Sequence, residues 1–296
     1  MVEVVEQARW LRDSVGVRAI DAGMLRVSGP DRRTWLQGQI TNDVQATATG
    51  DAVYTLVVDV RGKILADAWV LDRGDALDLV LSKNQVGPLR DHLDRFLVME
   101  DVELTPVDAR IVTAQGPRAH EIEGFACDRL GTGGIDVIDG DLDEIVARAR
   151  GLGGGLVDEA AWTLARIRAG RPAYGIDFDR ENYPQETGLD PIAVSFEKGC
   201  YVGQEVVCML QNRGQLRRRL VKLLGDSEPA TGAKLRFGDA DVGEITSHAF
   251  DAEAGGAWAL AYVKRVHAVR GNTLTSDSGP LTIREIPGSH ADGPDL

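Results

Sequence analysis

Residues 52–82 show the pattern of β-strands, with short runs of β-branched and apolar side chains. Turn-forming residues at 61–63 and 72–75 separate these runs. Such a pattern is typical of an antiparallel meander, in which tight turns join neighbouring strands. Over residues 84–98 the apolar positions change to helical spacing. We therefore expect a helix that covers one face of this sheet.

A succession of strand, Gly-Pro, basic residue and helix occurs twice in the first half of the chain. The first copy covers residues 25–32 and the second covers residues 111–118. Proline is favoured at the first position of a helix, so each copy predicts a strand followed by a helix start. An internal duplication would explain the recurrence and would imply two related α+β lobes. Chance recurrence of a common start signal explains it equally well.

Short strands dominate the chain from Leu220 onward. Gly, Asp and Pro separate them at regular intervals, which is typical of a small β-barrel or sandwich. Together these patterns predict an α+β fold in three parts, with the two lobes free to exchange segments. The expected parts are a first lobe at 1–100, a second lobe at 101–219 and a C-terminal barrel at 220–296. The last residues, from Pro287, are expected to be disordered.

The composition of the 296-residue chain narrows the function classes. Hydrophobic residues make up 43% of the chain, enough for a core, and no apolar run approaches the length of a transmembrane helix. The net charge is −13 and neither end carries a basic tract, so nucleic acid is not expected as the main partner. The N-terminus lacks the basic and apolar segments of a signal peptide.

Three cysteines occur at positions 127, 200 and 208, in no CxxC or CxxH spacing. An odd number without such spacing argues against a disulfide framework or a closed zinc site, and no metal site is expected. A reduced, cytoplasmic compartment fits this cysteine usage best. Because four local thiolates are not available, any iron–sulfur chemistry would be performed on a partner protein.

The stretch from Glu197 to Val207 concentrates reactive groups in a tight turn before a helix. Gly199 and Gly203 permit backbone angles and close approaches that a side chain would forbid. Cys200 is then expected at or just before a helix N-terminus with Lys198 two residues away, a setting that favours the thiolate. The thiolate is the form that reacts or binds a metal. Alternatively, Cys200 is a small buried residue that fills a tight turn.

Two further polar features of the sequence are candidates for ligand binding. Asp67 lies in the middle strand of the meander, where a carboxylate on an apolar face is costly unless it is paired or bound. A solvent-facing position in the strand is the alternative. The one basic cluster of the chain is formed by Arg213, Arg217, Arg218, Arg219 and Lys222. It is either a solvated face or an attraction point for a polyanionic ligand.

Residues 198–205, Lys-Gly-Cys-Tyr-Val-Gly-Gln-Glu, resemble the K-G-C-Y-x-G-Q-E signature of the YgfZ family. Members of that family are folate-binding proteins linked to iron–sulfur cluster assembly and repair, and the similarity extends over most of the chain. The family is in turn similar to the glycine-cleavage T-protein, an aminomethyltransferase that uses tetrahydrofolate. The resemblance implies two related α+β lobes and a C-terminal barrel around a central channel of folate size.

Three departures from these families bear on function. The T-protein has an acidic residue where Cys200 stands and a glutamate where Arg168 stands. A guanidinium presents only donors and cannot accept the N–H edge of a pterin, so Arg168 argues against aminomethyl transfer. Arg168 is instead expected to hold a carboxylate of the glutamyl tail. Cys208 and Met209 replace the alanine and arginine that are usual in YgfZ proteins.

The resemblance also implies roles for individual residues. Asp67 corresponds to an aspartate that contacts folate in the T-protein, so it is the best candidate for a pterin or tail contact. Cys200 and Lys198 are expected to be catalytic, Cys200 as a reactive or ligating thiol and Lys198 as the residue that tunes it. The other residues expected to bind the cofactor are Asn42, Arg168, Tyr174, Tyr201, Gln204 and Glu205.

The expected function is that of a tetrahydrofolate-dependent accessory protein in iron–sulfur cluster assembly or repair. Its expected partners are folate and iron–sulfur proteins or their assembly machinery, without membrane contact and with a monomeric chain. A folate-dependent one-carbon transferase or demethylase is the first alternative. A scaffold that uses its channel only for protein contacts, without a cofactor, is the second.

Overall fold

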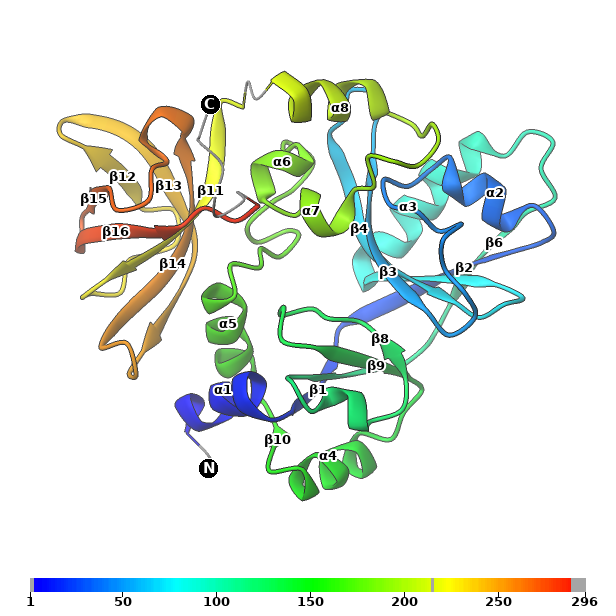
Figure 1. Ribbon diagram of the computed structural model, residues 1–296, viewed down its shortest axis with the longest axis horizontal. Coiled ribbons are helices and arrows are strands. Elements are labelled where there is room, and N and C mark those ends of the chain that lie inside the picture. Colours follow the sequence, from blue (N-terminus) through cyan, green and yellow to red (C-terminus); the bar gives the residue numbers. More distant parts are fainter. Residues whose placement is uncertain (1–2, 214–215, 289–296) are drawn as a thin grey trace.

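Two five-stranded sheets and a closed barrel form this computed structural model, which describes residues 3–213 and 216–288 (Figure 1). Helices cover the sheets, and the barrel stands apart on the C-terminal side. The α+β class and the C-terminal barrel expected from the sequence are thereby confirmed. In the described residues no helix is long and apolar enough to cross a membrane.

The first sheet has the strand order β3-β4-β5-β2-β6 and is antiparallel throughout. Its consecutive neighbours β3, β4 and β5 form the predicted meander. The strands are β2 (Ala22–Ser28), β3 (Ala52–Val58), β4 (Ile64–Asp72), β5 (Leu77–Ser82) and β6 (Glu103–Val107).

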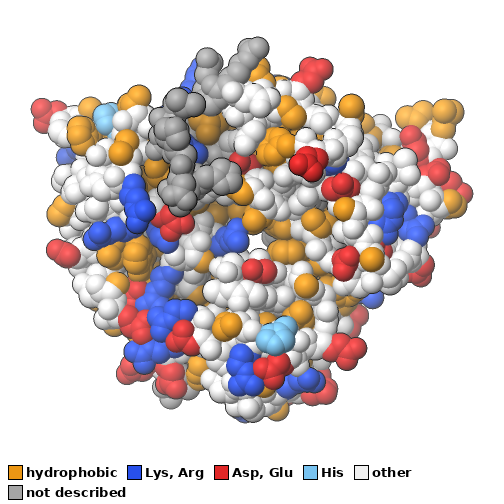
Figure 2. Space-filling view, in the orientation of Figure 1, with side chains coloured by type: hydrophobic (Ala, Val, Ile, Leu, Met, Phe, Trp, Pro, Cys, Tyr) orange, Lys and Arg blue, Asp and Glu red, His pale blue; other side chains and the backbone are white. Residues whose placement is uncertain are grey.

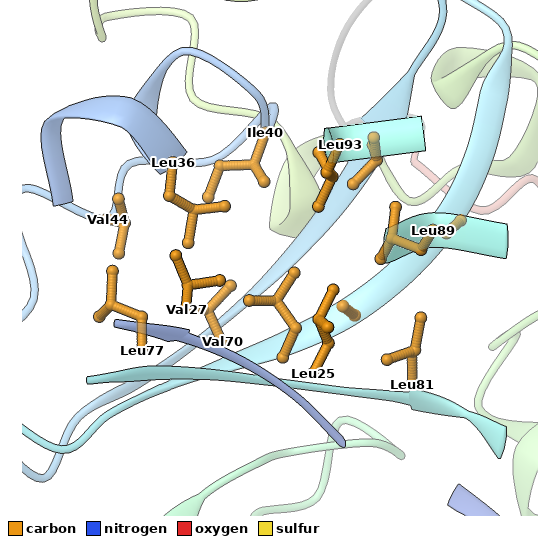
Figure 3. Packing of buried hydrophobic residues seen from close by; sticks show 14 of the residues in the cluster. Leu25, Val27, Leu36, Ile40, Val44, Val70, Leu77, Leu81, Leu89 and Leu93 are labelled. Carbon is orange, nitrogen blue, oxygen red and sulfur yellow. The ribbon is translucent and has the colours of Figure 1, made fainter. Parts of the chain in front are cut away.

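Helices cover one face of this sheet and enclose the main hydrophobic core. Leu36 and Ile40 come from α2 and the turn after it, and Leu89 and Leu93 come from α3; all four point toward the strands (Figure 3). The predicted helix over 84–98 divides into a central α-helix between two short 3-10 turns. The helical elements are α2 (Arg32–Gln37), η1 (Lys83–Gln85), α3 (Val86–Leu93) and η2 (Asp94–Phe96).

The second sheet has the strand order β10-β1-β7-β9-β8, and its core packs against α4. The strands are β1 (Gly16–Ile20), β7 (Ile111–Gln115), β8 (Phe125–Ala126), β9 (Gly134–Ile138) and β10 (Gly155–Leu156). The helical elements around it are α1 (Val4–Asp13), η3 (Ala119–Glu121), α4 (Leu142–Gly151) and α5 (Glu159–Arg168).

The two sheets exchange one strand each. β1 precedes β2 in the chain but pairs with β7, whereas β6 precedes β7 but pairs with β2. The N-terminal residues through Ile20 thus belong to the second lobe, and β6 belongs to the first. The expected division at residue 100 had assigned both segments to the other lobe. Each lobe thus contributes one strand to the sheet of the other lobe, and the backbone hydrogen bonds of these strands hold the two lobes together.

The two Gly-Pro turns occupy matching positions in the two lobes. The backbone N–H of Asp31 donates to Asp101 O, just before β6, and that of Arg118 donates to Ser14 O, just before β1. Gly29 and Gly116 have φ of +100° and +127°, and a Cβ would lie 2.1 Å and 2.4 Å from these same carbonyl oxygens. Both turns thus make the same kind of contact with the residue that leads into an exchanged strand. This correspondence favours internal duplication over chance. The second copy continues only into η3, not into a full helix.

The barrel closes in the order β11-β14-β13-β12-β15-β16, which settles the choice between barrel and sandwich. Its interior is filled by aliphatic side chains. Pro287 is ordered against Gly188, whereas residues 289–296 of the tail that is expected to be disordered lie outside the described residues. The elements are β11 (Arg218–Gly225), β12 (Lys234–Phe237), β13 (Ala240–Asp251), β14 (Gly256–Lys264), η4 (Arg265–His267), β15 (Thr273–Ser276) and β16 (Gly279–Glu285).

The segment between α5 and the barrel packs mainly on the first lobe. Phe178, Leu189 and Tyr201 share a buried cluster with Leu56 and Ile64 of the first sheet. Because apolar burial is the main favourable term in packing, this cluster fixes the segment that carries the Cys200 turn. Its helices are α6 (Pro184–Thr187), α7 (Asp190–Ala193) and α8 (Gln204–Arg213).

Candidate functional site

A pocket of about 250 Å³ lies where the first lobe, the second lobe and the segment after α5 meet. Figure 2 shows the surface hollowed at the middle of this face. The first lobe contributes residues of β2 to β5, the second lobe contributes residues 128–130, and α5, residues 171–174 and α7 complete the wall. A concave site with a few polar groups at a junction of lobes is the usual setting of a ligand pocket.

Asp67 faces this pocket because of the two-residue period of β4. Ala66, Ala68 and Val70 point into the core of the first lobe, so Asp67 points to the opposite side. Tyr54 on the neighbouring strand donates its hydroxyl hydrogen to Asp67 Oδ2 at 2.8 Å. Desolvation raises the pKa of Asp67, and the Tyr54 hydrogen bond opposes the rise only in part. The Asp67 carboxyl therefore lies in the pocket with a hydrogen bond from the Tyr54 hydroxyl.

Aromatic rings line the same pocket as this carboxyl. The rings of Tyr54 and Trp69 lie 5.4 Å apart, and Trp162 and Tyr174 also line the pocket. Tyr174 donates its hydroxyl hydrogen to Leu65 O at 2.9 Å, which fixes its ring beside β4. Flat aromatic rings together with the Asp67 carboxyl suit a heteroaromatic ring with N–H donors.

Three arginines line the same pocket, and none of them was singled out by the sequence. Arg129 pairs with Asp136, its Nε lying 3.2 Å from Oδ1, and Arg166 pairs with buried Asp177. Arg171 is half-buried and has no acidic partner among the described residues. It is thus available to an anionic group of a ligand. Arg166 and Arg171 lie within three residues of Arg168, where the T-protein has a glutamate, and this closeness is the sequence signal that could have identified them.

Arg168 takes a different place from the one expected. Its Nε donates to Asp251 Oδ2 at 2.6 Å, and its NH2 group lies 3.0 Å from Glu253 Oε2. Both carboxylates belong to the barrel, and Arg168 does not line the pocket. With its donors committed to them, Arg168 joins α5 to the barrel and is not positioned to hold a glutamyl tail. The pairing could not be foreseen because it spans 83 residues.

The Cys200 turn lies against the first lobe at the start of α8. Gly203 has φ of +80°, and a Cβ there would lie 2.3 Å from Asp59 O, so the turn needs glycine at this position. The backbone N–H of Val202 donates to Gly38 O at 3.1 Å. Cys200 is exposed and precedes α8 by four positions. It is not among the residues that line the pocket around Asp67.

Lys198 is buried beneath this turn. Its Nζ donates to Gln37 O at 2.7 Å, Ile40 O at 2.7 Å and Asn42 O at 2.8 Å. These carbonyls lie at and beyond the C-terminus of α2, where carbonyl oxygens lack helical partners. Burial lowers the pKa of Lys198 to about 8. All three ammonium hydrogens are donated to carbonyls, and none of them is directed to Cys200. The expected lowering of the Cys200 pKa by Lys198 therefore stays a prediction.

The remaining sequence candidates lie away from the pocket lining. Asn42 donates to Tyr54 O at 2.7 Å and to Ile192 O at 2.9 Å, which joins β3 to α7. Tyr201 is buried, and its hydroxyl has no partner among the described residues. Gln204 is half-buried and Glu205 is exposed in the first turn of α8. Of the expected cofactor-binding residues, the pocket unites Asp67 and Tyr174.

The three cysteines are free and differ in exposure. Cys127 is buried, Cys208 is partly exposed on α8, and Cys200 is exposed. Burial raises the pKa of the Cys127 thiol well above its usual range, so this thiol is unreactive. Within residues 3–213 and 216–288, no group of three or more His, Cys, Asp or Glu side chains is placed to hold a metal ion.

Comparisons with known proteins agree with this architecture. Residues 2–128 match the family described as the GCVT N-terminal domain. The tRNA-modifying protein YgfZ of Yersinia enterocolitica is 26% identical over 304 residues, covering 90% of each chain. That of Vibrio vulnificus is 26% identical over 226 residues, covering 70% of this chain and 69% of the relative.

A solved structure shares the whole fold. The glycine cleavage system aminomethyltransferase T from Bartonella henselae superposes with a TM-score of 0.81 at 19% identity, covering 97% of this chain and 89% of that protein. A similarity of this extent at such low identity shows the three-part fold. Together with the YgfZ relatives that align over most of the chain, it shows a protein that is similar to the YgfZ proteins and shares the fold of an aminomethyltransferase.

Proposed function

We propose that the pocket around Asp67 binds tetrahydrofolate or a derivative, and that the protein acts as an accessory factor in iron–sulfur cluster assembly or repair in the cytoplasm. The observation that carries the folate proposal is the combination, in one pocket, of a half-buried carboxyl, aromatic rings and an arginine without an acidic partner among the described residues. A pterin has an N–H edge for the carboxyl and a face for the rings, and the glutamyl tail has carboxylates for Arg171.

An accessory role is favoured over aminomethyl transfer by the place of Arg168. The T-protein carries a glutamate there, whereas here a guanidinium turns away to Asp251 of the barrel. Asp67 is then the central carboxyl for the pterin, although Asp21 and Asp128 also line the pocket. In this proposal tetrahydrofolate supplies one-carbon chemistry when bound, and the chain's own residues orient it and exclude water.

A second candidate function is a step in tRNA modification, because the YgfZ relatives are named tRNA-modifying proteins. The net charge of −13 does not favour direct capture of RNA by electrostatic attraction. The folate-dependent transferase and the cofactor-free scaffold remain the other candidates. A scaffold without a cofactor would not bind folate, so a folate-binding measurement distinguishes it from the other candidates. Turnover of a methylamine donor with folate would establish the transferase.

Titration with tetrahydrofolate tests the pocket directly. We expect saturable quenching of tryptophan fluorescence, because Trp69 and Trp162 line the pocket. Arg171→Gln should weaken binding about tenfold, the usual effect of losing one charge-assisted hydrogen bond. Arg168→Met is the matched control and should leave affinity unchanged while lowering the melting temperature. No quenching by tetrahydrofolate, confirmed by calorimetry, would leave the scaffold as the surviving candidate.

Cys200 is the proposed reactive or ligating thiol, since it is the exposed cysteine of the three. Cys200→Ala should abolish complementation of a cluster-repair defect and leave the melting temperature nearly unchanged, because no buried contact is lost. In the folded protein, iodoacetamide should modify Cys200 first and Cys127 last. Cys208→Ala is the control, and an equal loss of complementation in that variant would remove the special status of Cys200.

A further inference from the structure

A second pocket, of about 370 Å³, lies beside α3, between that helix and the start of β4. Leu65 and Leu89 form part of its apolar lining, and Arg180, from the loop before α6, closes one side. This pocket shares none of its lining residues with the pocket around Asp67. It therefore needs a separate explanation.

Positive charge gathers at this pocket in a chain that is acidic overall. Arg95 and Arg180 line it, are exposed, and have no acidic partner among the described residues. His92 also lines the pocket, and its pKa is lowered by desolvation and then by Arg95 and Arg180, with Asp59 opposing. Asp91 is the only acid in the described lining. Two unpaired guanidinium groups beside an imidazole are the groups that recognise a phosphate.

Gln85, in the wall of this pocket, has a side-chain acceptor without a donor. Gln85 lines it, and its Oε1 is buried with no hydrogen-bond partner among the described residues. A buried acceptor left unpaired is costly, so groups of this kind usually meet a ligand or water. A ligand that satisfied Gln85 would bring an O–H or N–H donor, in addition to the anionic group that suits the arginines.

We propose that this pocket binds a small organic phosphate that carries hydroxyl donors, such as a sugar phosphate. The phosphate lies between Arg95 and Arg180 near His92, and the carbon skeleton covers the apolar side of the pocket. Rotation of the Gln85 side chain brings its Oε1, which is withdrawn from solvent in this structure, to a hydroxyl of the ligand. This inference does not depend on folate binding, because the two pockets have separate linings.

Ribose 5-phosphate, inorganic phosphate and ribose are the probes, and the His92 ring signals in an NMR titration are the readout. Bound phosphate should raise the pKa of His92, because a negative charge favours the imidazolium. Arg95→Gln combined with Arg180→Gln should weaken binding of both phosphates at least tenfold. Arg90→Gln is the matched control, since Arg90 is exposed on α3, beside the pocket, and lines no described pocket.

Gln85→Met separates the hydroxyl contact from the phosphate contact. It should weaken ribose 5-phosphate severalfold and leave inorganic phosphate unchanged. Absence of any His92 shift with ribose 5-phosphate, or an equal shift in the double arginine variant, would overturn the proposal. An equal response to ribose alone would overturn it as well, since the phosphate would then contribute nothing.

Discussion

Asp67→Asn is expected to weaken tetrahydrofolate binding by about ten- to a hundredfold while leaving the folded chain at least as stable as before. The carboxyl is the acceptor that a pterin N–H edge requires, and the loss of a hydrogen bond to a charged group typically costs about 1.5–3 kcal/mol. In the absence of ligand, the only side-chain hydrogen bond that Asp67 receives among the described residues comes from Tyr54, which an amide oxygen also accepts.

The stability part of this prediction follows from the direction of the pKa shift. Because desolvation raises the pKa of Asp67, the folded chain binds this proton more tightly than the unfolded chain does. Stability is therefore lost as the pH rises from the ordinary aspartate value through the raised one, and the loss persists at neutral pH. Asparagine carries no charge, so the variant should lack this loss.

Thermal unfolding at several pH values, together with the folate titration, measures both effects. Asp78→Asn is the control, because Asp78 on β5 is buried and paired with Arg26, at 2.8 Å, and with Arg73. Its loss leaves two cations without their partner and should lower the melting temperature. Unchanged folate affinity in Asp67→Asn, or a fall in its melting temperature as large as that of Asp78→Asn, would contradict the role given to Asp67.

Lys198→Met should destabilise the fold by about 3 kcal/mol. Methionine matches the aliphatic stem but leaves the carbonyls of Gln37, Ile40 and Asn42 without their donor. Each unsatisfied buried polar group costs about 1–3 kcal/mol, and partial access to water at the edge of the turn offsets some of the total. The same change should loosen the Cys200 turn, which rests on this part of the first lobe.

Chemical denaturation of Lys198→Met measures this loss, and Lys83→Met is the control, since Lys83 is exposed on η1. Iodoacetamide labelling of Cys200 in the same variant tests the expected tuning. If Lys198 acts only on the fold, the labelling rate should stay unchanged at low denaturant concentration. A strongly reduced rate with unchanged stability would favour tuning of the thiol and contradict the structural role.

Local patterns in the chain were sufficient to predict the meander, the short strands of the C-terminal part and the turn at Cys200. Strand alternation, turn residues and glycines act over a few neighbours, so each can be recognised without knowledge of the rest of the fold. For Asp67 the sequence left open a paired or bound carboxylate and a solvent-facing one, and the structure puts it on the face of β4 that lines the pocket.

Only the tertiary structure decided which distant groups meet. The exchange of β1 and β6 depends on pairing between lobes, and the commitment of Arg168 to Asp251 spans 83 residues. Lys198 likewise meets carbonyls about 160 residues away, where a local argument had placed it beside the thiol. Charge and hydrogen-bond partners are set by distance in space, and the sequence records only distance along the chain.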